Sequence, residues 1–167
     1  MMGPLRDFGP CEAWYNSAKV GETQGRVGVR FSDRDAKVFE ASNGVTPVDA
    51  VHIGQDQVEV TVPFTRLSLA KLATILPGSS SGTSGIDISN NKVGTSKYDL
   101  SSELILKPII GTTVGASNTW LHIFKTYPRP DYDIPYSVEE GDQRLYNTVF
   151  ESFPDATTKK VWRVGAA

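Results

Sequence analysis

An alternation of apolar and polar side chains over residues 57–64, QVEVTVPF, constrains the fold of this chain more than any other feature. A period of two is the period of a β-strand with one buried face and one solvated face. The apolar positions are Val58, Val60, Val62 and Phe64, and the polar ones are Gln57, Glu59 and Thr61. Pro63 lacks a backbone donor, so we expect this strand at a sheet edge or close to its own end there.

Further strands are predicted along most of the chain. They cover a short pair in 12–20 with a turn at Asn16-Ser17, then 25–31, 36–42, 103–110, 119–127, 144–153 and 159–164. The strand at 36–42 is closed by Asn43-Gly44, a dipeptide that tolerates the positive φ angles of tight turns. The total is about eight strands, too many for anything but a mainly β domain.

Only one segment has the periodicity of a helix. In 65–78, TRLSLAKLATILPG, apolar residues recur at i, i+3, i+4 and i+7, namely Leu69, Leu72, Ala73 and Leu76. Thr65 or Ser68 can cap its start, and Pro77-Gly78 ends it. A helix of about eleven residues is marginal alone, so we expect it to lie against a sheet.

The expected fold is therefore a β-sandwich or barrel with one short flanking α-helix and long loop insertions. Residues 1–10 are predicted to form a loose N-terminal arm, and 11–167 a single domain. Insertions are expected at about 79–102, which is rich in Ser, Gly and Asn, and at 126–142, which is rich in Pro and acidic residues. Loops of this length in a compact domain usually have a function.

Charge and composition exclude several classes of function. The chain has 17 Lys and Arg against 19 Asp and Glu, a formal net charge of −2. Nucleic-acid binding requires a basic surface that displaces counterions, so a DNA-binding role is not expected. No stretch has the length and apolarity of a signal peptide or membrane span, so a soluble protein of the cytoplasm is predicted. Cys11 is the only cysteine, which excludes an intrachain disulfide.

Motifs that carry chemistry are missing, and neither catalytic residues, a cofactor nor a metal is expected. The Ser/Gly run at 78–85 lacks the lysine of a phosphate-binding loop, and neither a serine-nucleophile elbow nor a zinc-binding helix motif occurs. Asp33-Arg34-Asp35 is interpreted as a solvated charge cluster. His52 and His122, each flanked by apolar residues, are interpreted as hydrogen-bonded structural histidines. An enzyme whose site only folding assembles stays open as an alternative.

Aromatic residues fall on the predicted strands, and we expect them in the core. They are Trp14, Tyr15, Phe31, Phe64, Trp120, Phe124, Tyr146, Phe150 and Trp162. A stacking platform for single-stranded nucleic acid would interleave aromatic and basic residues. Only the terminal KKVWRV approaches that pattern, and it is short.

The order of these segments resembles that of bacteriophage tail tube proteins, also called major tail proteins. The opening GPCEAWYNSAKVGETQGRVGVRF (9–31) has a short strand pair ending in a Gly21-Glu22-Thr23 turn before a strand of alternating valines. The middle, NGVTPVDAVHIGQDQVEVTVPFTRLSLAKLATILPG (43–78), has a Thr-Pro-Val-Asp element, a valine-rich strand and a helix ended by Pro-Gly. The resemblance extends over 10–78 and, less closely, over 103–110, 119–125 and 143–164.

The resemblance implies a tail-tube fold and a structural role in the virion. Six copies would form a ring with a β-barrel inner wall, and rings assembled in the host cytoplasm would stack into the hollow tail. DNA would pass through the bore without specific binding. Other implied partners are tape measure, terminator and baseplate proteins, with a sheath if the tail is contractile. Neither a membrane nor a cofactor is implied.

Two sets of site residues follow from this reading. The segment 127–142 would span about 50 Å if extended, so we expect Tyr127, Tyr132, Ile134 and Tyr136 to contact a neighbouring copy, since aromatic residues concentrate interface energy. The alternative is an unpartnered surface loop. A bore that releases DNA should be neutral or acidic, so we expect Asp and Glu to outnumber Lys and Arg there, with Glu59 facing the lumen.

Two alternative functions remain at this point. One is another ring protein of the same lineage, such as a tail terminator, a baseplate protein or the tube of a type VI-like secretion system. The other, from a different class, is a glycan- or receptor-binding β-sandwich whose tyrosine-rich segment 127–136 stacks on sugars.

Overall fold

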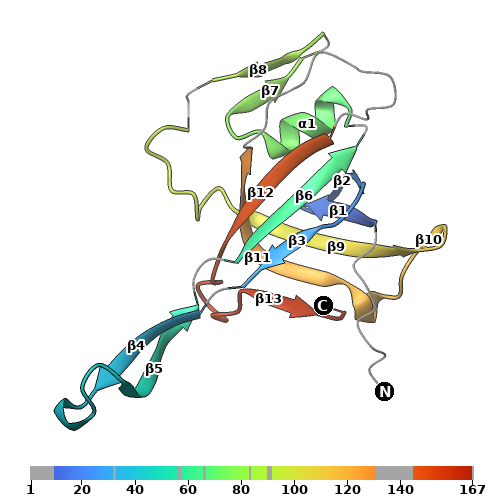
Figure 1. Ribbon diagram of the computed structural model, residues 1–167. Helices are drawn as coiled ribbons and strands as arrows, with labels where there is room; N and C mark the ends of the chain where they lie inside the picture. Colours follow the sequence, from blue (N-terminus) through green and yellow to red (C-terminus); the bar gives the residue numbers. More distant parts are fainter. Residues whose placement is uncertain are drawn as a thin grey trace.

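The computed structural model describes residues 10–31, 33–55, 58–65, 67–82, 84–89, 92–130 and 145–166. It confirms the mainly β fold class, with one short helix. Six strands close into a barrel because β9 pairs with both β1 and β11 (Figure 1). In order around the barrel they are β9 (Ser102–Ile110), β1 (Cys11–Tyr15), β2 (Ala18–Thr23), β6 (Glu59–Thr65), β12 (Leu145–Phe153) and β11 (Leu121–Pro130).

The inward side chains of these strands form one apolar core. Val58, Val60, Val62 and Phe64 are all buried, as the alternation predicted, while Thr61 is exposed and Glu59 half-buried on the outer face. Gln57 lies outside the described residues. The other strands contribute Ala13, Val20, Leu104, Leu106, Leu121, Ile123 and Phe150. Each such apolar side chain contributes about 1.5–3 kcal/mol relative to full exposure.

The position expected for Pro63 is wrong, because β6 lies in the middle of the sheet. It pairs with β12 on one side and with both β2 and β3 (Gly28–Arg30) on the other. The carbonyl of Pro63 accepts from the amide of Gln24 at 3.1 Å, so the Pro63 nitrogen faces the interval between β2 and β3. Strand pairing is interrupted there, and the missing donor leaves no gap in the ladder.

A tight turn at Asn16-Ser17 joins β1 to β2, as predicted, with φ angles of 50° and 63°. The Gly21-Glu22-Thr23 segment, in contrast, is not a turn. It is the end of β2, with Glu22 opposite Thr65 and Thr23 opposite Phe64. A bulge beside Ala13 and Trp14 turns both Val20 and Gly21 toward the interior. A Cβ on Gly21 would lie 2.9 Å from Leu67 Cδ2, so any larger residue there requires the end of the Leu67 side chain to move.

The helix α1 (Leu69–Ile75) lies across one end of the barrel (Figure 1). It is shorter than predicted and begins after Ser68, whose hydroxyl accepts from the Lys71 amide. Its buried residues are Leu72 and Ile75, whereas Leu69 of the predicted stripe is exposed. The helix is rotated from the expected orientation because Ile75, at 0 % exposure, is its most deeply buried side chain. Among the described residues, no helix is long and apolar enough to cross a membrane.

The remaining short elements lie around the barrel. β10 (Thr113–Val114) extends β9, and β13 (Trp162–Val164) pairs with the start of β11. The insertion expected at 79–102 contains a small hairpin of β7 (Ser79–Ser81) and β8 (Ile86–Ile88). The insertion expected at 126–142 begins inside β11, where Thr126 is fully buried, and 131–144 lie outside the described residues. Residues 1–9 of the expected N-terminal arm also lie outside them.

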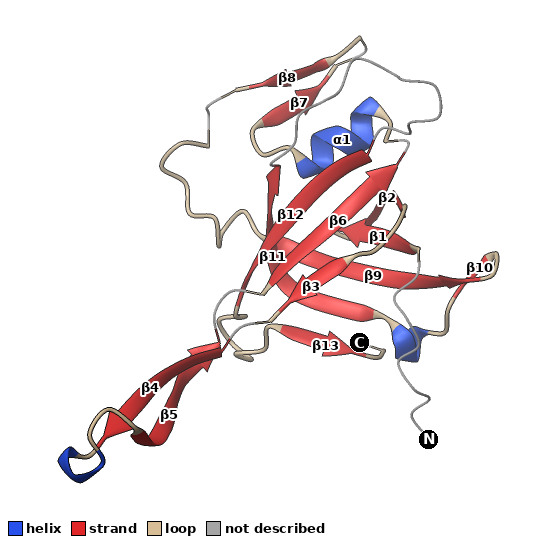
Figure 2. Ribbon diagram, in the orientation of Figure 1, coloured by secondary structure: helices blue, strands red, loops and turns tan. Residues whose placement is uncertain are grey.

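Strands β4 (Asp33–Phe39) and β5 (Pro47–Gln55) form a separate two-stranded sheet (Figure 2). The predicted strand at 36–42 therefore starts and ends three residues earlier. Its partner β5 was not predicted as a strand. Figure 1 shows this hairpin projecting away from the barrel, at the end opposite α1. We refer to residues 33–55 as the arm.

The expectation that the aromatic residues form the core is only partly correct. Tyr15, Phe64 and Phe150 are buried, with the Phe150 ring centroid 5.6 Å from that of Tyr15 and 6.4 Å from that of Phe64. The half-buried ones are Trp14, Trp120, Phe124 and Tyr146. Phe31 and Trp162 are exposed, because β3 and β13 lie at the rim of the barrel rather than around its middle.

A candidate assembly surface

The arm is built by two strands that pair over their whole length and turn at a glycine. The register runs from Asp33 opposite Gln55 near the barrel to Phe39 opposite Pro47 near the tip. At the tip, a 3-10 turn over Ala41–Asn43 is followed by Gly44, whose φ of 61° and ψ of −126° suit glycine. The Asn43-Gly44 signal in the sequence thus located this turn correctly.

The two faces of the arm differ in chemistry, because residues directly opposite each other on antiparallel strands share a face. One face carries the apolar Ala36, Val38 and Val51 together with Asp49. The other carries Asp35 opposite His52, with Oδ1 and Nδ1 at 3.7 Å, and Lys37 opposite Ala50. None of the described residues covers the apolar face, and Val51 is 54 % exposed.

His52, interpreted from the sequence as a hydrogen-bonded structural histidine, is exposed on the arm and lies 3.7 Å from Asp35, because none of the described residues forms a second layer against its strand. Asp35 belongs to the solvated charge cluster that was predicted around Arg34 and is exposed. At the foot of the arm, Phe31 and Trp162 contact each other with ring centroids 5.0 Å apart. Both rings remain exposed, so the rim of the barrel beside the foot of the arm also presents apolar surface to the solvent.

Of the four residues predicted to contact a neighbouring copy, the structure describes only Tyr127. Tyr132, Ile134 and Tyr136 lie in the range 131–144, outside the described residues. Tyr127 is half-buried on β11, and the Lys97 ammonium lies 5.5 Å from its ring centroid. The other side-chain neighbours of Tyr127 include Leu100 and Pro128, with which it lines a cavity.

That cavity has a volume of about 220 Å³ and lies between the end of α1 and the barrel wall. Its lining includes Tyr15, Thr74, Pro77, Leu100, Tyr127 and Pro128, with Lys92 among the remaining residues. The Tyr15 hydroxyl donates to the Thr126 carbonyl at 3.1 Å, which fixes one side of the cavity. The end of α1, which contributes Thr74 to the lining, and the arm lie at opposite ends of the molecule (Figure 1).

Glu59, predicted to face a lumen, points outward from β6 into a mixed cluster of charges. Glu151 is the centre of this cluster: it is buried and accepts from Lys97 at 2.8 Å and from Arg129 at 2.7 Å. Arg129 also lies 3.8 Å from Glu59. Burial alone would raise the pKa of Glu151, but the hydrogen bonds and charges of Lys97 and Arg129 outweigh it and lower that pKa. No acidic excess is visible among these four residues.

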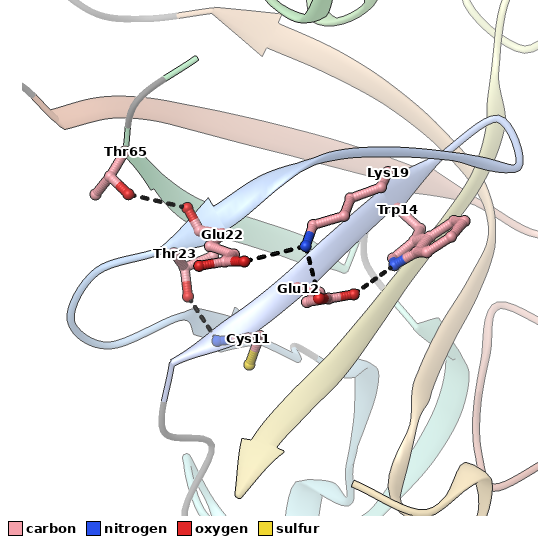
Figure 3. Close-up of polar contacts among 7 residues, drawn as sticks. All are labelled: Cys11, Glu12, Trp14, Lys19, Glu22, Thr23 and Thr65. Carbon is pink, nitrogen blue, oxygen red and sulfur yellow. Dashed lines mark hydrogen bonds and ion pairs between the residues drawn. The ribbon is translucent and has the colours of Figure 1, made fainter. Parts of the chain in front are cut away.

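A second charged cluster lies on the outer face of β1 and β2 (Figure 3). Lys19 donates to Glu12 at 2.6 Å and to Glu22 at 3.0 Å, and the Trp14 indole donates to Glu12 at 3.2 Å. The Lys107 ammonium extends this cluster, at 3.7 Å from the Trp14 ring centroid and 4.2 Å from that of Trp120. Lysine and tryptophan thus contact each other directly on this wall of the barrel.

Candidates for chemistry are sparse in the described part of the chain. Its His, Cys, Asp and Glu side chains form no group of three that could hold a metal. His122 is buried and hydrogen bonded through Nδ1 to Glu103 at 2.9 Å, as predicted for a structural histidine. Burial raises the pKa of the Cys11 thiol to about 11, which keeps it protonated and poorly nucleophilic.

The arm is the feature that sequence reasoning missed. Its signal is the set of apolar residues on both sides of the Asn43-Gly44 turn: Val38, Phe39, Val45, Val48, Val51 and Ile53. That pattern predicts a hairpin, but it does not state that the hairpin leaves the barrel. Comparison with known proteins gives no further assignment, since neither a family model nor a curated protein matches this sequence.

Proposed function

We propose that this chain is a structural subunit of a hollow cylinder built from its own copies, as in a bacteriophage tail tube. The observation that carries the proposal is the arm, a two-stranded sheet that projects from a complete barrel with its apolar face uncovered by the described residues. An isolated two-stranded hairpin is marginal in water. An exposed apolar surface of this kind marks a protein contact.

A second copy is the simplest partner for the arm, because the contact then needs nothing beyond this chain. A contact between two different patches of the same chain is head-to-tail, and repetition gives a ring or a helical filament. The arm and the surface around α1 lie at opposite ends of the molecule, so they are two different patches that a head-to-tail contact can use. The order of sequence segments, which resembles tail tube proteins, supports hexameric rings that stack into a tube.

The resemblance supplies the rest of the proposal. The bore would conduct DNA without specific binding, and the finished tube would meet tape measure, terminator and baseplate proteins in the virion. Glu59 remains the proposed lumen residue. Its neighbours Arg129, Glu151 and Lys97 balance its charge, so this part of the wall would be close to neutral rather than strongly acidic.

The competing glycan-binding function has less support. It relied on a tyrosine-rich segment, 127–136, of which the structure describes only 127–130. Within that described part Tyr127 is the only tyrosine, and Lys97 lies over one face of its ring. A ring-forming terminator or baseplate protein uses the same arm argument and differs only in the length of the polymer.

The test compares the full chain with a variant in which 33–55 is replaced by a short Gly-Ser linker. Light scattering over a range of concentrations should give oligomers for the full chain and monomers for the variant. Negative-stain images of the full chain should show long hollow cylinders, whereas a terminator would give single rings. A full chain that stays monomeric at every concentration and salt condition would overturn the proposal.

A further inference from the structure

A tube subunit needs a specific joint between copies, and the described residues contain two features of matching size. The first is the tip of the arm, where the Phe39 side chain is 55 % exposed and Val45 is 93 % exposed. The second is the cavity of about 220 Å³ beside Tyr127 at the other end of the molecule. This inference rests on the proposed function, because it assumes that the partner of the arm is another copy.

The size of the cavity fits one aromatic ring. A cavity of about 150 Å³ in a protein core is enough to bind benzene, and Phe39 carries a phenyl group. Pro77, Leu100 and Pro128 supply apolar contacts, and Tyr15 and Tyr127 supply aromatic ones. An aromatic anchor seated in a pocket is the usual form of an interface hot spot.

We propose that Phe39 at the arm tip of one copy inserts into the Tyr127 cavity of the next copy. The tip of the β4–β5 arm and the end of α1, which lines the cavity, lie at opposite ends of the molecule (Figure 1), so the joint is heterologous and repeats along a polymer. This assigns Tyr127 to an inter-subunit contact in a role that differs from the sequence-based prediction. Tyr127 forms the socket rather than the projecting anchor.

Charge at the two surfaces agrees with this joint. Glu40 follows Phe39 directly and is exposed, and Lys92 lies at the cavity and is also exposed. Docking the tip would bring a carboxylate toward an ammonium at the rim of the contact. Such a rim pair contributes specificity and a small part of the affinity.

The first experiment uses two variants that each disable one half of the joint. Phe39→Ala removes the anchor, and Thr74→Trp fills the cavity from an exposed position on α1. Each variant alone should need at least about tenfold more protein for half-assembly, as expected for the loss of a hot spot. The matched controls are Ile110→Ala, a similarly exposed apolar residue elsewhere, and Ala70→Trp, which adds the same bulk at an exposed position of α1 that does not line the cavity, and both should assemble like the wild type.

Mixing the two variants separates a head-to-tail joint from other contacts. An equimolar mixture retains one intact joint, the Phe39 of the filled-cavity chain in the open cavity of the Phe39→Ala chain. It should stop at paired units, either dimers or double rings, in electron micrographs. Cylinders of normal length from Phe39→Ala alone, or from the mixture, at the protein concentration where the wild type half-assembles would overturn the inference while leaving the proposed function intact. Wild-type protein that never assembles would overturn both.

A crosslink tests the contact directly. Chains carrying Glu40→Cys, which keep Phe39, are mixed with chains carrying Lys92→Cys and oxidised gently, and the buried Cys11 should not react. The expected product is a disulfide-linked heterodimer that separates into monomers when the disulfide is reduced. Cylinders without this crosslink would contradict the joint.

A charge swap gives the finest test. Glu40→Lys should weaken assembly by about two- to fivefold, and adding Lys92→Glu to the same chain should restore it. If the chain with both substitutions still assembles as weakly as Glu40→Lys alone, Glu40 contacts another part of the neighbouring copy. That result would overturn the proposed docking geometry.

Discussion

The barrel and the arm are built from similar strands, yet their apolar residues meet opposite surroundings. In barrel strand β6, Val60 and Val62 are fully buried. In arm strand β5, Val51 and Ile53 are more than half exposed. The two strands have comparable length and pair antiparallel with a neighbour. The difference shows that a strand's sequence specifies which face is apolar, but not whether the same chain covers that face.

This difference divides the stabilising free energy between folding and assembly. The barrel gains its hydrophobic stabilisation when one chain folds, because its apolar faces meet inside the ring of strands. Under the proposed assembly, the arm makes that gain in a later step, when a second copy removes its apolar face from water. A substitution should therefore act on folding if it lies in the barrel, and on self-association if it lies in the arm.

The largest expected effect on folding comes from Phe64→Ala in the barrel. Phe64 is fully buried and its ring contacts Phe150, so truncation leaves a cavity in the middle of the core. The free energy of unfolding should fall by about 3–5 kcal/mol, as measured by denaturant titration. The arm control is Ile53→Ala, which should change it by no more than about 0.5 kcal/mol. A similar loss from both variants would mean that the arm belongs to the folding unit.

A smaller effect is expected from Glu151→Gln on the outer wall. This carboxylate is buried, whereas Lys97 and Arg129 are about half exposed and remain solvated without it. The loss should therefore be about 1–2 kcal/mol near neutral pH, after allowance for solvent screening. The arm offers a matched control in Asp35→Asn, whose exposed partner is His52. Equal losses at the two sites would show that burial of Glu151 is unimportant.

The same variant should alter the pH dependence of stability. The pKa of Glu151 is lower in the folded chain than its ordinary value of 4.5, so the unfolded chain binds a proton first as the pH falls. The stabilisation from Glu151 is thus complete above pH 4.5 and declines as the pH drops toward the folded pKa. Denaturant titrations across this range should show a shallower decline for Glu151→Gln than for the wild type. Parallel curves would contradict this account.

The barrel was predictable from sequence to a greater extent than the arm. Alternation in 57–64 located β6 and the side chains it buries, and Asn16-Ser17 located the first hairpin. The central place of β6 was not predictable, because Pro63 is accommodated by an interruption between β2 and β3 that only the three-dimensional pairing reveals. The projection of the arm from the barrel was not predictable, because alternation predicts a half-buried strand whether its apolar face is covered by the same chain or by another.

The candidate site was predictable only in part, and for a similar reason. Tyr127 was expected to project toward a neighbour, but its strand β11 continues through it, and the residue lines a cavity instead. That cavity combines residues from α1, β1, β9 and β11 with residues of the connecting segments. Because these residues are distant in sequence, no local sequence pattern predicts that they line one cavity.

A modest stabilisation is expected from Ser17→Gly in the barrel's first turn. Ser17 has a φ of 63°, a conformation that disfavours residues with a Cβ. Glycine should raise the free energy of unfolding by about 0.5–1 kcal/mol, measured by thermal and denaturant melts. The arm's turn provides the reverse substitution, since Gly44 also has a positive φ of 61°. Gly44→Ala should leave the unfolding of the barrel unchanged, and a loss there would show that the two hairpins fold together.

The smallest effect on folding is expected from Val38→Ser combined with Val51→Ser on the arm. Both side chains are exposed on the same face, so a single chain loses little burial, and its unfolding free energy should stay within about 0.5 kcal/mol of the wild type. Assembly should nevertheless fail in light scattering, because this face has to leave water only when a partner covers it. Ala50→Ser, on the opposite face, is the matched control and should assemble normally.

If the double variant assembles like the wild type, the partner contacts only the polar face of the arm or its tip. If it unfolds more easily, the apolar face is already covered within one chain, and the distinction between barrel and arm fails.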